Sequence, residues 1–115
     1  MKVIRSRSAA RYEPEPAWKR LSLCAEPDIS VEHFVKPARH SSPRHGHHSA
    51  QVLVVLEGRL TIVTDAETQT LDQGDCVYLP GNEPHVVTNP LDTPSVGLDI
   101  FVPGRSFDFW LKRKK

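Results

Sequence analysis

Cysteine is scarce in this sequence, which has 115 residues and only two cysteines, Cys24 and Cys76. Two cysteines outside a Cys-x-x-Cys arrangement are too few for a disulfide framework. We therefore expect two reduced, partly buried thiols. Long apolar runs are missing as well, because no stretch approaches the roughly 18 residues that span a bilayer. A membrane is thus not an expected partner.

An excess of charge of either sign is also missing. Fifteen lysines and arginines against fourteen acidic residues give a formal net charge of +1. No strong field would draw nucleic acid or an anionic membrane, so neither is an expected partner. The first residues are basic without an apolar core, which excludes a secretory signal, and Glu13 and Glu15 count against a transit peptide. A cytoplasmic protein is expected.

Helical periodicity is the third absence. The apolar segments are short, rich in β-branched residues and separated by Gly, Pro, Asp and Asn clusters, which is typical of many short strands. We expect strands at 18–25, 29–36, 51–56, 59–65, 68–71, 76–79, 85–89 and 96–102. The segments at 51–56 and 59–65 are expected to form a hairpin, and 68–71 is expected to pair with 76–79. This pattern predicts an all-β fold, either a double-sheet barrel or a sandwich.

The length predicts one domain. Residues 1–16 end in Glu-Pro-Glu-Pro, where the prolines exclude a helix or a central strand, and we interpret them as an N-terminal arm. Residues 17–111 are expected to form the β-barrel domain. Residues 112–115 are a basic C-terminal tail that we interpret as solvated.

The most informative cluster is His45-Gly46-His47, followed by Gln51, with His85 in a separate segment. If residues 43–56 form one strand, His45, His47 and Gln51 share a face, because alternate residues of a strand point the same way. His85 on a neighbouring strand would then complete the site. Imidazole nitrogens bind zinc, nickel, copper or iron, and the amide oxygen adds a harder, neutral donor. The sequence therefore predicts a metal site.

Two motifs in the middle of the chain resemble those of the cupin superfamily. The first is His-x-His, three residues, Glu, six residues and Gly, and it is matched by His45, His47, Gln51 and Gly58. Gln thus replaces Glu. The second is Gly, five residues, Pro-x-Gly-x-x-His, three residues and Asn, and it is matched by Gly74, Pro80, His85 and Asn89.

Asn82 replaces the inner glycine of the second motif, a mild change because Asn tolerates left-handed backbone. The joint spacing of the two motifs is specific. The resemblance implies a double-stranded β-helix, the cupin jelly-roll barrel. It also implies that one metal ion is bound at one end of the barrel by His45, His47, Gln51 and His85.

The C-terminal part resembles the small pectin-degradation cupins, which open the ring of 4,5-unsaturated uronates and also use Gln as the fourth ligand. The matching residues are Asp99, Phe101 and Arg105, followed by Asp108-Phe109. The resemblance implies catalytic roles: Asp99 as general acid or base, Arg105 holding a carboxylate, and Phe101 as an apolar wall. Asp99 and Phe101 share parity, so both face the metal if 96–102 pairs beside the His85 strand.

Three neutral imidazoles and a neutral amide leave the charge of a divalent ion uncompensated, which favours an anionic ligand. The expected cofactor is one divalent ion among Ni, Zn, Fe, Mn and Co. The expected function is a non-redox, metal-dependent enzyme of the isomerase or lyase type, acting on a sugar acid or a similar small anion in carbohydrate metabolism. The alternatives are a non-catalytic barrel that binds or senses a small molecule, and a cupin dioxygenase.

A small anionic molecule and a second copy of the chain are the expected partners. Val52, Val54 and Leu56 face away from the predicted ligands, which suits either a homodimer or packing on the other sheet. Asp99 is alternatively an internal hydrogen-bonding group, and Arg105 a surface or interface ion pair. An aromatic plug over one barrel end or against a second subunit is expected from Phe107, Phe109 and Trp110.

Overall fold

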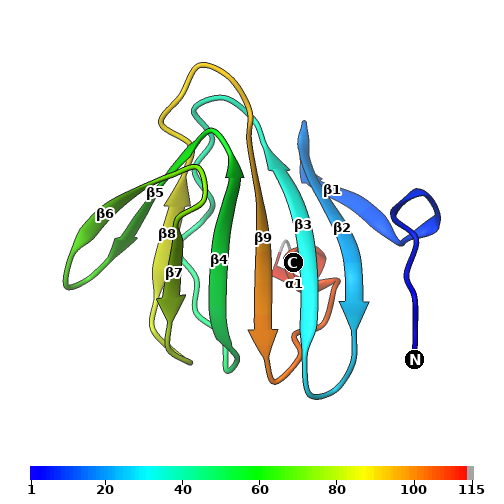
Figure 1. Cartoon of the computed structure of the whole chain (residues 1–115). Coiled ribbons are helices and arrows are strands. Elements are labelled where there is room, and N and C mark those ends of the chain that lie inside the picture. Colours follow the sequence, from blue (N-terminus) through cyan, green and yellow to red (C-terminus); the bar gives the residue numbers. More distant parts are fainter. Residues whose placement is uncertain (114–115) are drawn as a thin grey trace.

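The structure is a computed structural model that describes residues 1–113. Within these residues the chain forms nine strands, a short 3-10 turn and a short C-terminal helix (Figure 1). The elements are η1 (Ser6–Ser8), β1 (Arg11–Glu15), β2 (Trp18–Ala25), β3 (Ser30–Lys36), β4 (Ala50–Glu57), β5 (Arg59–Thr64), β6 (Thr68–Asp72), β7 (Cys76–Leu79), β8 (His85–Thr88), β9 (Ser95–Val102) and α1 (Phe109–Arg113).

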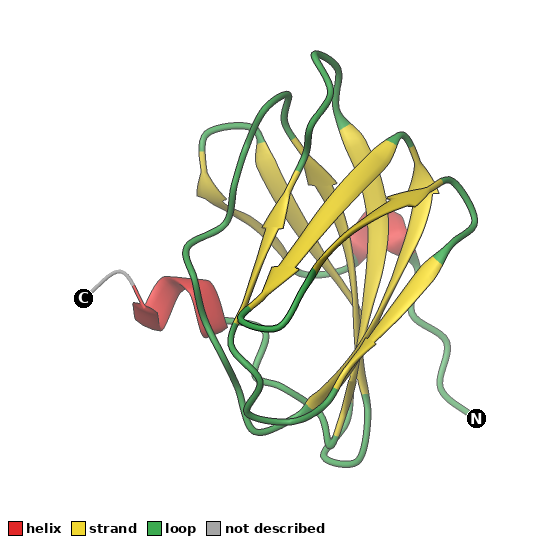
Figure 2. Cartoon of the chain, turned by 90° about the vertical axis from the view of Figure 1, so that its left-hand side faces the viewer, coloured by secondary structure: helices red, strands yellow, loops and turns green. Residues whose placement is uncertain are grey.

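The strands of residues 1–113 form two antiparallel sheets. The larger sheet has the order β1-β2-β3-β9-β4-β7, and the smaller has the order β6-β5-β8. Figure 2 shows the two layers from the side. The all-β, double-sheet prediction is confirmed.

The hydrophobic core lies between the sheets. Along β4 the buried side chains are Gln51, Leu53 and Val55. Leu53 and Val55 belong to the apolar core, and the polar Gln51 lies beyond them toward one end of the barrel. Gly97 on β9 makes room for the core, because a Cβ there would lie 2.4 Å from Cζ of Phe34. The buried core cluster consists of Phe34, Leu53, Val55, Leu60, Ile62, Leu79 and Val87.

All eight predicted strands are present within two residues at each end, but their pairing was predicted wrongly. β4 pairs with β9 and β7 rather than with β5, and β6 pairs with β5 rather than with β7. β9 lies between β3 and β4, not beside the His85 strand β8. The turns at Gly58 and Gly74, with φ of +83° and +90°, carry the chain from one sheet to the other instead of closing hairpins.

The segment at 1–16, predicted as an arm, contains a strand. Residues Arg11–Glu15 pair with β2 as β1, at the edge of the larger sheet, which fits the exclusion of a central strand by proline. At the other end, Lys112 and Arg113 of the predicted tail belong to helix α1, an element that the sequence did not predict because five residues show no periodicity. Lys114 and Lys115 of that tail lie outside the described residues.

Two asparagines of the second motif hold the loops around the barrel end. Asn82 has a φ of +65°, which confirms that it takes a glycine-like backbone, and its N–H donates to the His47 carbonyl at 2.7 Å. Asn89 is fully buried and its side chain bonds to five partners, namely the carbonyls of Lys36, Pro37 and Thr93, the N–H of Leu91 and the hydroxyl of Ser95. These bonds fix the loop that follows β8.

No helix in residues 1–113 is both long enough and apolar enough to cross a bilayer. Both cysteines are free thiols, but Cys76 is exposed rather than partly buried.

Candidate metal centre

Three histidines from two separate segments meet at one end of the barrel. His45 and His85 form an isolated antiparallel bridge, in which their backbone N–H groups donate to each other's carbonyls at 3.1 and 2.9 Å. His47 follows on the loop that leads into β4. One nitrogen from each of the three rings lies within 4.8 Å of the other two. This cluster could hold a metal ion.

The single strand predicted for 43–56 is not present, because β4 begins only at Ala50. The loop before it brings the second histidine to the strand in another way. His47 Nε2 lies 3.0 Å from Oε1 of Gln51, the first inward residue of β4. The structure therefore brings the four predicted ligands together, although a loop and not strand parity places His47.

Backbone carbonyls fix the tautomer of all three rings. The Nδ1–H groups of His45, His47 and His85 donate to the carbonyls of Pro43, Ser49 and Glu83, each at 2.8 Å. In a neutral imidazole the other nitrogen then carries a lone pair. All three Nε2 atoms are thus left as acceptors. That of His85 is buried and has no hydrogen-bond partner within residues 1–113.

The three rings are held neutral. Burial, and then the neighbouring His85, lower the pKa of His45 to about 2. Burial is also the main cause that lowers the pKa of His47 and His85, and Arg105 contributes to both. At neutral pH the Nε2 lone pairs are therefore available to a cation without competition from protons.

Gln51 is turned so that its oxygen faces the histidines. Its Nε2 donates to Oδ1 of Asp99 at 2.8 Å, and a carboxylate can only accept here, so the amide oxygen must point the other way. Oε1 of Gln51 consequently faces the lone pair of His47 Nε2. Two acceptors at 3.0 Å repel each other unless a cation lies between them.

These residues fit a metal ion. His47 Nε2 and Gln51 Oε1, at 3.0 Å, are close enough for one ion to bind both. His45, His47 and His85 would supply imidazole nitrogen, and Gln51 an amide oxygen. This donor set suits several divalent ions.

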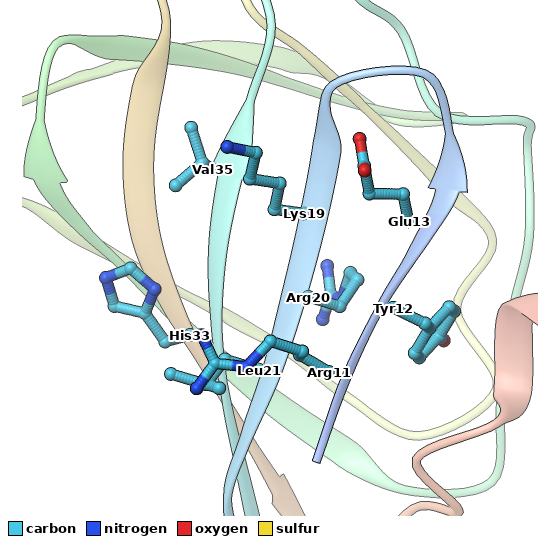
Figure 3. Close-up of a pocket in the computed structure, with 8 residues that line it drawn as sticks. All are labelled: Arg11, Tyr12, Glu13, Lys19, Arg20, Leu21, His33 and Val35. Carbon is cyan, nitrogen blue, oxygen red and sulfur yellow. The ribbon is translucent and has the colours of Figure 1, made fainter. Parts of the chain in front are cut away.

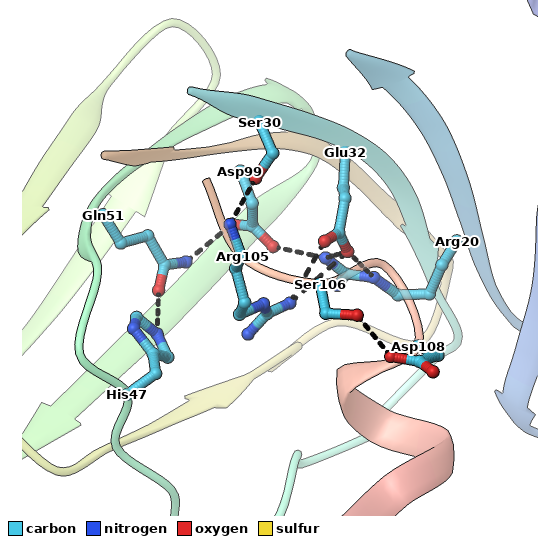
Figure 4. Close-up of polar contacts among 9 residues, drawn as sticks. All are labelled: Arg20, Ser30, Glu32, His47, Gln51, Asp99, Arg105, Ser106 and Asp108. Carbon is cyan, nitrogen blue, oxygen red and sulfur yellow. Dashed lines mark hydrogen bonds and ion pairs between the residues drawn. The ribbon is translucent and has the colours of Figure 1, made fainter. Parts of the chain in front are cut away.

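A buried network of charges adjoins the cluster (Figure 4). Arg20 is 3% exposed and its Nη2 donates to Glu32 Oε1 at 2.6 Å and to Asp99 Oδ2 at 2.8 Å. Burial alone would lower the pKa of Arg20, but these two carboxylates outweigh it and raise the pKa. Arg20 therefore remains charged and anchors Asp99, which in turn holds Gln51.

Arg105 lies in the same network but is less firmly paired. Its Nη2 is 3.4 and 3.5 Å from the two oxygens of Glu32, and its buried Nε has no hydrogen-bond partner within residues 1–113. The guanidinium carbon lies 3.9 Å from the Phe101 ring centroid and 4.2 Å from that of Phe109. Burial lowers the pKa of Arg105 to about 10, so the side chain is still a cation at neutral pH.

Helix α1 packs against two of the three imidazoles. The Trp110 ring lies 4.5 Å from that of His45, and the Phe109 ring lies 5.9 Å from both His45 and His47. Arg113 joins the helix to the histidine loop through the Arg44 carbonyl at 3.3 Å. Phe109 and Trp110 of the predicted aromatic plug thus lie at the barrel end that carries the histidines, whereas Phe107 packs against Tyr12 at 4.9 Å.

A pocket of about 560 Å³ lies elsewhere, along β1, β2 and β3 (Figure 3). It is lined by Arg11, Tyr12, Glu13, Lys19, Arg20, Leu21, His33 and Val35. None of the four predicted metal ligands contributes to it.

Comparison with known proteins identifies the family. The model of the cupin domain family, Cupin_2, matches residues 32–101. The chain belongs to the cupin family. The matched region runs from Glu32 to Phe101 and contains both histidine motifs of this cupin. No curated protein matches the chain.

Solved structures resemble nearly the whole chain. An RmlC-like cupin from Shewanella frigidimarina is 22% identical with a TM-score of 0.83, over 95% of this chain and 96% of that one. KdgF from Halomonas sp. is 20% identical with a TM-score of 0.82, over 92% and 96%. The polyketide cyclase RemF from Streptomyces resistomycificus is 18% identical with a TM-score of 0.74, over 91% and 81%. At these identities the likeness shows the fold.

Sequence reasoning missed three charged residues inside the cupin barrel. Glu32 and Lys36 lie on the inward face of β3, and Arg20 on that of β2. Burial, and then Arg20, lower the pKa of Lys36 to about 7, and its Nζ lies 4.5 Å from the Trp18 ring centroid. Alternation did separate Glu32 and Lys36 from the apolar residues of β3, but it gave no sign that the polar side faces inward.

Proposed function

We propose that this cupin is a non-redox, metal-dependent enzyme that acts on a sugar acid or a similar small anion. Ring opening of a 4,5-unsaturated uronate is the specific reaction we put forward. One observation carries the proposal: a neutral ligand set of three imidazoles and an amide adjoins a buried arginine, Arg105, whose contacts with its carboxylate partner are long.

The ligand set favours an anionic substrate. His45, His47, His85 and Gln51 bring no charge, so a divalent ion bound by them would keep its full charge toward the open side. Such an ion would polarise hydroxyl or ring oxygens of a bound sugar acid. The same charge would attract the carboxylate of that sugar acid.

Arg105 is suited to hold the carboxylate. A guanidinium offers a planar fork of N–H groups, and here the Nε–H has no partner within residues 1–113. Phe101 and Phe109 stack on the guanidinium and restrict its orientation. Phe101 also lies 5.3 Å from the His47 ring, so it would form an apolar wall between Arg105 and the metal centre.

Asp99 is the candidate for proton transfer. It is 5% exposed and accepts from Gln51 through one oxygen and from Arg20 through the other. Each carboxylate oxygen has a second lone pair, so Asp99 can still accept a proton from a bound hydroxyl and return it. The bonds to Gln51 and Arg20 would hold it in one orientation during that exchange.

NMR of the purified protein with an unsaturated uronate tests the proposal. We expect metal-dependent conversion to the linear product, and no conversion by the His45→Ala/His47→Ala variant. A rate no higher than that of this variant, with each of the candidate divalent ions supplied, would remove the enzymatic proposal.

The same experiment separates the other two interpretations. A binding or sensing barrel would show saturable shifts of the uronate signals without turnover. A dioxygenase would consume oxygen with its substrate and stop under anaerobic conditions, whereas ring opening would continue.

A further inference from the structure

The glutamine at position 51 is a departure from the Glu of the first cupin motif, and the structure offers a physical reason for it. Gln51 Nε2 lies 2.8 Å from Oδ1 of Asp99, and both side chains are buried at 3% and 5% exposure. A glutamate at position 51 would place two carboxylates in that contact, where they would repel each other or have to take up a proton. Repulsion between like charges is strong at this separation away from water.

Asp99 cannot rotate to relieve such a contact, because its other oxygen is held by Arg20 at 2.8 Å. Arg20 is in turn fixed by Glu32 through Nε at 3.0 Å and Nη2 at 2.6 Å. The orientation of Gln51 is therefore determined by three buried side chains, those of Asp99, Arg20 and Glu32. This chain of bonds ends at the amide oxygen beside His47.

We propose that Asp99 is a positioning residue that dictates glutamine at position 51 and turns its oxygen toward the metal. Residues 51 and 99 thus form a matched pair, in which one member must be an amide and the other a carboxylate. The inference rests on the metal-binding part of the proposed function, but not on the substrate or on turnover.

Substitution of Asp99 by asparagine reverses the geometry. Arg20 can only donate hydrogen bonds, so it would donate to the oxygen of the amide introduced at position 99. The NH₂ group of that amide would then face Gln51. Gln51 would then turn its own oxygen toward that NH₂ group and present its own NH₂ group to the metal. We expect Asp99→Asn to weaken Co²⁺ binding about 10- to 100-fold, the range typical when a partner of a metal ligand is lost.

A double variant that exchanges the two groups, with the carboxylate at position 51 and the amide at position 99, provides the decisive test. In Gln51→Glu/Asp99→Asn, one oxygen of the carboxylate introduced at position 51 would accept from the amide introduced at position 99. The other oxygen would face the metal, so Co²⁺ affinity should return to within a few-fold of wild type. Gln51→Glu alone should lower the Tm of the metal-free protein, and adding Asp99→Asn should recover it. If Asp99 served only to hold Arg20, the double variant would bind Co²⁺ no better than Gln51→Glu alone, which carries the same carboxylate at position 51.

Isothermal titration with Co²⁺ and the visible spectrum of the bound ion give the readouts, and neither depends on catalysis. Asp72→Asn is the matched control, because Asp72 also pairs with an arginine but is exposed. Unchanged Co²⁺ affinity in Asp99→Asn, or no recovery in the double variant, would overturn the inference while leaving uronate turnover as a separate question.

The metal-free wild type offers a test that needs no variant of Asp99. The side-chain NH₂ protons of Gln51 should exchange with water far more slowly than those of the exposed Gln73, because one of them is bonded to Asp99 in a buried setting. Equal exchange rates for the two side chains would contradict the matched pair.

Discussion

The indole ring of Trp110 packs edge-on against the imidazole of His45, with ring centroids 4.5 Å apart and planes at 68°. This contact joins the C-terminal helix directly to a predicted metal ligand. A side chain that is absent from both histidine motifs therefore covers the candidate metal centre.

Trp110 should report metal binding through its fluorescence. Open-shell ions such as Ni²⁺, Co²⁺ or Cu²⁺ quench nearby indoles, and Trp110 lies closer to the cluster than Trp18, which contacts Trp110 at 4.9 Å. We expect quenching on titration of Ni²⁺ into the metal-free protein, and most of it should be lost in Trp110→Phe but kept in Trp18→Phe. Equal quenching in the two variants would place the ion elsewhere.

Metal-free protein should lose stability as the pH falls below about 6.5. The histidine pKa values in the fold lie below the ordinary value of 6.5, so below that pH the unfolded chain binds more protons. The contribution of these neutral histidines to the free energy of unfolding is complete above pH 6.5, and it is lost as the pH falls toward their pKa values in the folded state. For His45, with a pKa of about 2, the expected slope is about 1.4 kcal/mol per pH unit.

Denaturant unfolding at pH 5 and pH 7.5 checks this dependence. His45→Gln should reduce the slope, whereas His48→Gln should not, because His48 is exposed. A free energy of unfolding that stays constant between the two pH values would contradict the neutral, buried histidines.

Lys36→Met should stabilise the protein. Lys36 is 1% exposed and its pKa is lowered to about 7 by burial, so its charged form is unfavourable in the fold. Replacing this buried charge by an apolar side chain of similar length should raise the free energy of unfolding at pH 7 by about 1–4 kcal/mol. Lys19→Met, on the exposed side of β2, is the control and should change it little.

The wild-type protein should also gain stability between pH 7 and about pH 10. In that range the unfolded chain retains a proton on Lys36 that the folded chain has released. A destabilised Lys36→Met variant would instead show that the contact of the ammonium with the Trp18 ring outweighs the cost of burial.

Arg105→Lys should impair uronate turnover more than the same substitution at an exposed arginine. Lysine keeps the charge but loses the planar fork and the stacking on Phe101 and Phe109. We expect KM for the uronate to rise about tenfold or more, equivalent to at least about 1.4 kcal/mol. Arg59→Lys, at an exposed arginine paired with Asp72, serves as the control. Equal KM values in the two variants would remove Arg105 from substrate binding.

The outer face of the larger sheet should mediate a homodimer. Val31, Ile100, Val52 and Tyr78 form one continuous row across β3, β9, β4 and β7, and all four point away from the core. Tyr78 is 64% exposed, so the row is open to a partner. Light scattering after gel filtration should give twice the chain mass.

A charge in this face should separate the subunits. Val54→Glu lies in the adjacent row, and we expect it to produce monomers, whereas Thr70→Glu on the exposed β6 strand should leave the dimer intact. A monomeric wild-type protein would contradict the predicted partner.

The sequence by itself determined the strands, the family motifs and the candidate ligands. Short β-branched segments between turn residues are local signals, and so is the spacing that joins His45 to Gln51 and Gly74 to His85. Asn82 could be recognised as a substitute for glycine because a left-handed backbone is a property of single residues.

Only the tertiary structure decided which strands pair, which face is inward and what each site residue contacts. The chain passes from the larger sheet to the smaller one between β4 and β5, so β4 pairs with β9 rather than with β5, and local turn signals cannot report that. The apolar side of β3 faces outward because Glu32 and Lys36 are accommodated inside, Glu32 by Arg20 and Lys36 by Trp18. The bond that orients Gln51 joins residues 48 positions apart, and such a contact exists only once the chain has folded.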